Sequence, residues 1–204
     1  MASSGEMVTA MAGLFDLPVA TVESIDRVLS DAGLRKKGGR GRSAAQMTGI
    51  DIANLTFALI LGVGMKDAPS AVAKVTAMPR KSADVQWDAD LLRLRHNLLL
   101  PPEQDLSTFA GGRALADAPT LGEGIAALID AMAAGEFGDA EEMQINFQMT
   151  SRGPAASLTY WKRKDALRVE YEAIGPDISR PVFERQLKLD EISIRHLADV
   201  IRPS

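Results

Sequence analysis

The sequence contains no cysteine. This absence excludes a disulfide framework, a thiolate metal site and a thiol nucleophile. Histidine is nearly as scarce, because the chain has just His96 and His196, and neither stands at a metal-ligand spacing from another ligand. A catalytic triad needs a histidine beside a nucleophile and an acid, and no local pattern provides one. We therefore expect no metal site and no cofactor.

Long apolar runs are also missing. No window approaches the roughly 18 apolar residues of a membrane-spanning helix. The first residues, "MASSGEMVTAMAGLF", have neither the basic part nor the sustained apolar part of a secretory signal. Apolar residues still make up 46% of the 204 residues, so the chain can build a core without disulfides. We expect a globular cytoplasmic protein that does not bind membranes.

The sequence shows no enzymatic pattern. The carboxylates in "DADLL" and "GDAEEM" lack the spacing of a calcium loop. The glycines in "GVGMKDAPS" follow a predicted helix rather than a strand, and they lack the phosphate-loop pattern. We therefore expect a protein that is not an enzyme and has no catalytic residues.

The charge is unevenly distributed. Although the formal net charge is −4, residues 1–80 carry nine Lys/Arg against seven Asp/Glu, and residues 81–204 carry fourteen against twenty. Residues 35–42, "RKKGGRGR", which we call the basic run, contain five cations: Arg35, Lys36, Lys37, Arg40 and Arg42. A compact patch of this kind attracts polyanions within a screening length of about 8–10 Å. DNA contact is the main interpretation; the alternatives are an idle solvated loop and contact with RNA or an acidic protein.

Periodic apolar residues predict helices on both sides of the basic run. "LPVATVESIDRVLSDAGL" predicts a helix with Thr21 as N-cap and Gly33 at its end, and "MVTAMAGLF" predicts a shorter helix before the proline of "DLP". After the run, "MTGIDIANLTFALILG" predicts an apolar helix with Thr48 and Asp51 at N-cap and N3. "APSAVAKVTAM" predicts a further short helix. The N-terminal part is therefore expected to be helical.

The C-terminal part mixes helices and strands. "TLGEGIAALIDAMAAG" predicts a capped helix, and "DEISIRHLADVI" predicts an amphipathic one. Four segments alternate as strands do: "MQINFQMT", "ASLTYWKR", "ALRVEYEA" and "VFERQLKL". This pattern predicts an α+β fold, with a helical N-terminal region and C-terminal helices packed on a small antiparallel sheet.

Three regions are expected along the chain: residues 1–80, a connecting region at 81–119, and an α+β region at 120–204 for oligomerisation or partner binding. Within the connecting region, "DADLLRLRHNLLLPP" favours a helix or a strand and "FAGGRALADAP" a loop. The terminal helix has an apolar stripe that favours an oligomer interface. Near the middle of the α+β region, "YWKRK" (160–164) either stacks on bases or packs in the sheet, and packing is the preferred interpretation.

The order "MAGLFDLPVATVESIDRVLSDAGLRKKGGRGR" resembles the helix-turn-helix half of winged-helix regulators. Residues 7–62 are also similar to proteins of alphaproteobacterial phages and prophages. In such regulators, a short helix and a turn precede a recognition helix, and a basic glycine-rich wing follows. The resemblance implies a recognition helix at residues 19–32 and a wing formed by the basic run.

The resemblance also implies a site and a function. Thr21, Ser24 and Arg27 share one face of the recognition helix and would contact bases. The five cations of the basic run would bind phosphates of double-stranded DNA. The implied function is a non-enzymatic DNA-binding protein, a phage- or prophage-type transcriptional regulator that forms a homo-oligomer through residues 120–204. The alternatives are a small-terminase-like DNA-packaging component and a protein–protein adaptor with a basic loop.

Overall fold

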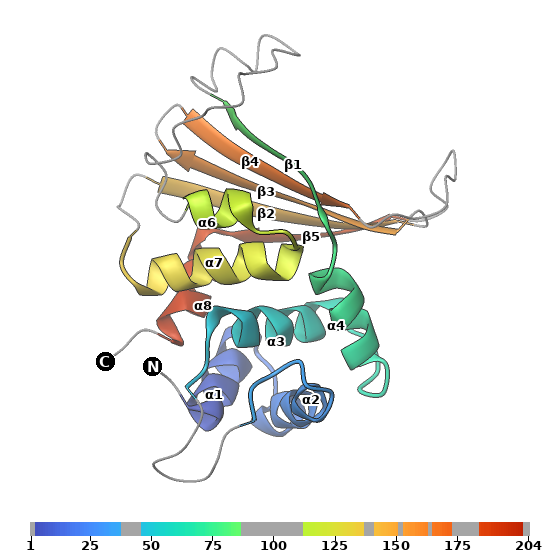
Figure 1. Ribbon diagram of the computed structural model, residues 1–204. Coiled ribbons are helices and arrows are strands. Elements are labelled where there is room, and N and C mark those ends of the chain that lie inside the picture. Colours follow the sequence, from blue (N-terminus) through green and yellow to red (C-terminus); the bar gives the residue numbers. More distant parts are fainter. Residues whose placement is uncertain are drawn as a thin grey trace.

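A computed structural model describes residues 3–37, 46–86, 112–136, 141–150, 153–162, 165–172 and 184–201. These residues form the predicted α+β fold, with helices packed on one face of an antiparallel sheet (Figure 1). The helices are α1 (Ser4–Leu14), α2 (Val19–Asp31), α3 (Gly49–Leu61), α4 (Ala68–Thr76), α6 (Gly112–Asp117), α7 (Leu121–Ala133) and α8 (Glu191–Asp199).

The sheet has five strands in the order β1-β4-β3-β2-β5, and every neighbouring pair is antiparallel. The central strand β3 places Leu158 opposite Val169 and Tyr160 opposite Leu167 of β4, and all four side chains are buried. The four predicted strands are confirmed, and β1 is an additional edge strand that alternation did not predict. The strands are β1 (Arg80–Gln86), β2 (Glu141–Thr150), β3 (Gly153–Lys162), β4 (Asp165–Glu172) and β5 (Glu184–Asp190).

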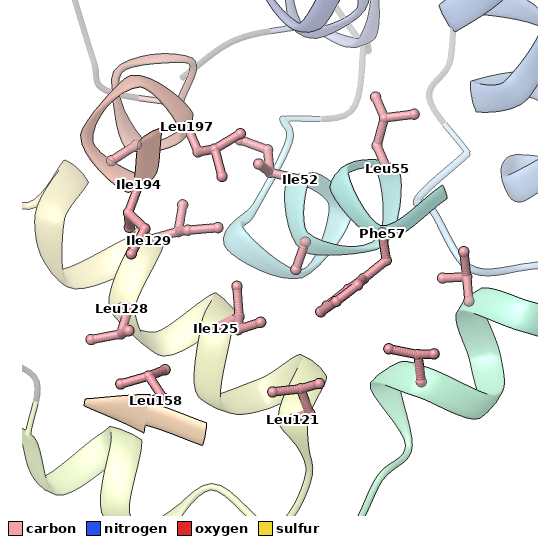
Figure 2. Close-up of a cluster of buried hydrophobic side chains, with 14 of the residues drawn as sticks. Ile52, Leu55, Phe57, Leu121, Ile125, Leu128, Ile129, Leu158, Ile194 and Leu197 are labelled. Carbon is pink, nitrogen blue, oxygen red and sulfur yellow. The ribbon is translucent and has the colours of Figure 1, made fainter. Parts of the chain in front are cut away.

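The helices form successive layers beneath the sheet. Figure 1 shows α6 and α7 next to the sheet, α3 and α4 beyond them, and α1 and α2 farthest from the sheet. In the close-up of Figure 2, Ile52 and Phe57 of α3 lie near Ile125 and Ile129 of α7, and all four are buried. One cluster of buried apolar side chains contains residues from α1 through α8, so it crosses the predicted region boundaries at residues 80 and 119.

Local signals mark the helix ends. Thr48 and Asp51 stand at N-cap and N3 of α3, as predicted. Gly33 follows α2 with a φ of 76°, a left-handed conformation that suits glycine, and Leu34 N–H donates to the Leu29 carbonyl at 2.9 Å. The N-cap of α2 is Pro18, however, so the prediction of Thr21 as N-cap is wrong. The helix begins earlier because the Pro18 carbonyl accepts the N–H of Thr21.

Two further expectations are corrected by tertiary packing. "FAGGRALADAP" is not all loop, because α6 forms in it and buries Leu115 and Ala116 in the core. The apolar stripe of α8 is mostly internal, since Ile194 and Leu197 are buried, whereas Ile192 is 64% exposed. The segment "DADLLRLRHNLLLPP" lies outside the described residues.

Candidate nucleic-acid interface

Helices α1 and α2 form the end of the molecule that is farthest from the sheet (Figure 1). A short turn joins them, and Asp16 in this turn has a φ of 50°. Val22 and Leu29 anchor α2 in the core, because both are completely buried. The opposite face of α2 is therefore presented to solvent. This arrangement confirms the predicted sequence of helix, turn and helix.

The three predicted base-contacting residues lie toward the open side of α2. Thr21 and Arg27 are exposed, and Ser24 is half-buried. The Ser24 hydroxyl donates to the Ala20 carbonyl at 2.7 Å, so it is engaged with its own helix. Arg27 Nη2 lies 3.3 Å from Glu23 Oε1 in an exposed ion pair. Exposed pairs of this kind contribute about 0–1 kcal/mol, so Arg27 can exchange Glu23 for another anion.

Arg35, the first cation of the basic run, turns inward. Its Nε lies 2.5 Å from Asp26 Oδ1 of α2, and the two side chains are 9% and 6% exposed. The Ser4 hydroxyl of α1 donates to the other Asp26 oxygen at 3.3 Å. Burial raises the pKa of Asp26, while the charge of Arg35 and the Ser4 hydrogen bond lower it. We expected Arg35 to be exposed and to bind a phosphate. Instead, its guanidinium contacts Asp26.

The next two cations point outward. The Lys36 side chain is exposed, while its backbone N–H donates to Asp51 Oδ1 at 2.9 Å. Lys37 is 67% exposed, and its Nζ lies 3.6 Å from Asp31 Oδ1 at the end of α2. Such a long exposed contact holds a lysine weakly. Both ammonium groups are therefore accessible to a phosphate beside α2.

The carboxylate of Asp51, which binds Lys36, also binds Thr48, which follows the basic run. Thr48 donates its backbone N–H and its hydroxyl to Asp51 Oδ2 at 2.9 and 2.8 Å. Gly49 donates its N–H to Asp130 Oδ1 of α7 at 2.9 Å. The capping role of Asp51 follows from its spacing to Thr48. Its contact with Lys36, like the pairing of Asp26, had no signal in the sequence.

A groove of about 480 Å³ runs between α1 and α2. Ser4, Val8, Val19 and Arg27 line it, with the Asp26–Arg35 pair among its lining residues. The groove thus combines apolar side chains with charges that already have partners. No group of three potential metal ligands occurs in the described part of the chain.

The remaining sequence candidates are separated by the fold. Tyr160 is fully buried, and its neighbour Trp161 is partly exposed, because successive side chains of a strand point to opposite faces. The preferred interpretation, packing in the sheet, holds for Tyr160. His196 is exposed on α8, whereas Arg40, Arg42 and His96 lie outside the described residues.

Comparisons with known proteins assign no family. No protein-family model matches the chain, and searches of curated proteins and of solved structures find none that is similar to it. None of the helices described is long and apolar enough to cross a membrane. Function is therefore inferred from the residues of α2 and of the segments that flank the basic run.

Proposed function

We propose that the chain is a non-enzymatic cytoplasmic DNA-binding protein, a transcriptional regulator of the phage or prophage type. In this proposal, α2 contacts base edges through Thr21, Ser24 and Arg27, and the cations of the basic run other than the buried Arg35 contact phosphates. The observation that carries it is the position of Lys37, whose Nζ lies 3.6 Å from Asp31 at the end of α2. The exposed face of a helix and the start of a cationic segment are therefore neighbours.

Electrostatics support contact with a polyanion. The sequence between Asp31 and Asp51 has five cations and no carboxylate, although the whole chain has a net charge of −4. Charges farther away than about 8–10 Å are largely screened at physiological salt, so the local excess governs binding. Each phosphate that a cation contacts releases counterions and strengthens binding at low salt.

The proposal includes a homo-oligomer. A single helix-turn-helix contacts few base pairs, and binding to two half-sites multiplies the affinity. Residues 120–204 are the proposed interface, where Ile192 of α8 is 64% exposed. Because Ile194 and Leu197 are internal, α8 supplies only part of such an interface.

A protein–protein adaptor is the second candidate. The carboxylates of Glu23 and Asp31 on α2 are 59% and 72% exposed, and they repel phosphates approaching that helix. An acidic protein partner would contact the basic run without lying along α2. The two candidates differ in whether duplex DNA binds at all.

A salt-dependent titration tests the proposal. Fluorescence anisotropy of a labelled duplex is measured between 50 and 200 mM salt with the wild type, K36A/K37A and the control K81A/R113A. Lys81 and Arg113 are also in exposed ion pairs, but they belong to β1 and α6. K36A/K37A is expected to lower the log–log salt slope by up to about 1.8, at about 0.9 for each lost contact.

The control defines what contradicts the proposal. K81A/R113A is expected to keep the affinity and the salt slope of the wild type. Absence of binding by the wild type at 50 mM salt contradicts DNA binding and favours the adaptor. Equal slopes for the wild type and K36A/K37A exclude the two lysines from the phosphate contact.

A further inference from the structure

We infer that Asp51 is a positioning residue for DNA contact, because its carboxylate ties the backbone of Lys36 in the basic run to the N-terminus of α3 and sets where Lys36 and Lys37 present their charges. This inference rests on the proposed function. It concerns Asp51 and the residues it touches, all of which are described. Asp51 itself does not contact the DNA, since it is 2% exposed.

The carboxylate of Asp51 accepts three hydrogen bonds from two separate segments. Oδ1 accepts the N–H of Lys36, which lies 15 residues before Asp51, at 2.9 Å. Oδ2 accepts the N–H and the hydroxyl of Thr48, which lies three residues before it, at 2.9 and 2.8 Å. Hydrogen bonds to a charged carboxylate are about twice as strong as neutral ones. One side chain therefore holds the backbone of Lys36 beside Thr48 at the N-terminus of α3.

These contacts exceed what a helix cap requires. A capping residue at N3 needs one oxygen to accept the N-cap N–H. Here Thr48 occupies that oxygen, and the second oxygen binds Lys36 from outside the helix. The charge lies at the N-terminus of α3, where the helix dipole favours an anion. Asp51 therefore caps α3 with one oxygen while its other oxygen holds the backbone of Lys36.

The neighbouring contacts orient the cations. The Arg35 side chain is held inward by Asp26, and the Lys36 backbone is held by Asp51. The side chains of Lys36 and Lys37 are left exposed, and that of Lys37 lies beside Asp31 at the end of α2. Fixing the backbone before binding reduces the entropy that the lysines lose when they contact phosphates.

Asp130 provides a matched control. Its Oδ1 accepts the N–H of Gly49 at 2.9 Å, at the same end of α3, and none of its hydrogen bonds reaches Lys36. D51N and D130N each remove one negative charge near the basic run. The electrostatic effect on DNA affinity is therefore similar, and the loss of the Lys36 contact is specific to D51N.

Amide hydrogen exchange of the ¹⁵N-labelled full chain tests the contacts directly. An asparagine at position 51 has one acceptor oxygen, so either Lys36 or Thr48 faces an NH₂ donor. D51N is expected to speed the exchange of the Lys36 and Thr48 amides by about tenfold, relative to the Gly124 amide in α7. D130N is expected to speed the exchange of the Gly49 amide and leave Lys36 unchanged. Unchanged exchange at Lys36 in D51N overturns the inference.

DNA affinity tests the positioning role. D51N is expected to bind a labelled duplex at least about fivefold more weakly than D130N, although both lose the same charge. T48A removes one hydroxyl donor and is expected to show a smaller loss, of about twofold, if D51N fails to fold. Equal affinities of D51N and D130N, or of T48A and the wild type when D51N does not fold, overturn the inference. A wild type that binds no DNA refutes the proposed function, while the exchange rates still report on the contacts of Asp51.

Discussion

The Nε atom of Arg35 lies 2.5 Å from Oδ1 of Asp26, and this ion pair ties the first cation of the basic run to the buried side of α2. Both side chains are more than nine-tenths buried. A buried pair depends on both partners, because a single charge without the other is poorly solvated. Arg35 therefore stabilises the packing of α2 through its ion pair with Asp26.

Replacing Arg35 by methionine is expected to lower the free energy of unfolding by about 3–5 kcal/mol, because Asp26 then remains buried without its cation. The double variant D26L/R35M removes both charges and is expected to regain most of this loss. Urea unfolding followed by circular dichroism measures both. R27M, which removes an exposed cation of α2, is the control. A loss below 1 kcal/mol for R35M would contradict the importance of the pair.

Tyr171 is expected to make the fold sensitive to alkaline pH. Burial raises the pKa of its hydroxyl, so the folded state keeps the proton where the unfolded state, with a pKa of about 10, loses it. The stability that this group contributes is present below about pH 10 and is lost as the pH rises through the folded value. Y171F is expected to flatten the fall in the free energy of unfolding between pH 9 and 11.

Another buried hydroxyl serves as the control for Tyr171. Thr56 Oγ1 and Tyr171 Oη are both buried without a hydrogen-bond partner among the described residues. T56V and Y171F are therefore each expected to leave stability at pH 7 unchanged or slightly higher. T56V is expected to keep the wild-type pH profile. Identical alkaline profiles for the wild type and Y171F would be inconsistent with the role given to Tyr171.

Gly124 of α7 leaves room for the same tyrosine. A Cβ atom at this position would overlap Oη of Tyr171. G124A is expected to lower the free energy of unfolding by about 1–3 kcal/mol, as overpacking does in well-filled cores. The loss is expected to be smaller in a Y171F background, where that oxygen is absent. Equal losses in both backgrounds, measured by denaturant unfolding, would place the strain elsewhere.

Arg27 is expected to govern sequence discrimination. R27A should reduce the difference in binding free energy between a selected site and random DNA by about 1–3 kcal/mol, because a base contact is lost. Anisotropy titrations with both duplexes measure the difference, and R113A on α6 is the control. Equal losses on both duplexes would assign Arg27 to the phosphate backbone.

The full chain is expected to be a homodimer or a higher oligomer. Light scattering at tens of micromolar should then report at least twice the 21.8 kDa of one chain. The full chain is the right sample, because one core cluster joins residues from α1 through α8. A mass of one chain would remove the oligomer from the proposal and favour the adaptor.

The sequence by itself determined features that depend on neighbours along the chain. Thr48 and Asp51 cap a helix because their three-residue spacing brings them together in its first turn. Gly33 ends α2 because glycine adopts positive φ at low cost. Alternating residues identified β2, β3, β4 and β5 because side chains in a strand point alternately to its two faces. These features indicated the α+β fold.

Only the tertiary structure decided which charges turn inward. Asp26 and Arg35 look like surface residues in the sequence, yet they form a buried ion pair. Nothing in the sequence indicates that the backbone N–H of Lys36 donates to Asp51, 15 residues later. Both contacts depend on how α1, α2 and α3 pack, which local spacing does not specify. The same holds for α6 and β1, which form because the core and β4 offer them surfaces to pack and pair against. Contacts between residues that are distant in the sequence form only when the helices pack. This packing buries the side chain of Arg35 and leaves those of Lys36 and Lys37 exposed.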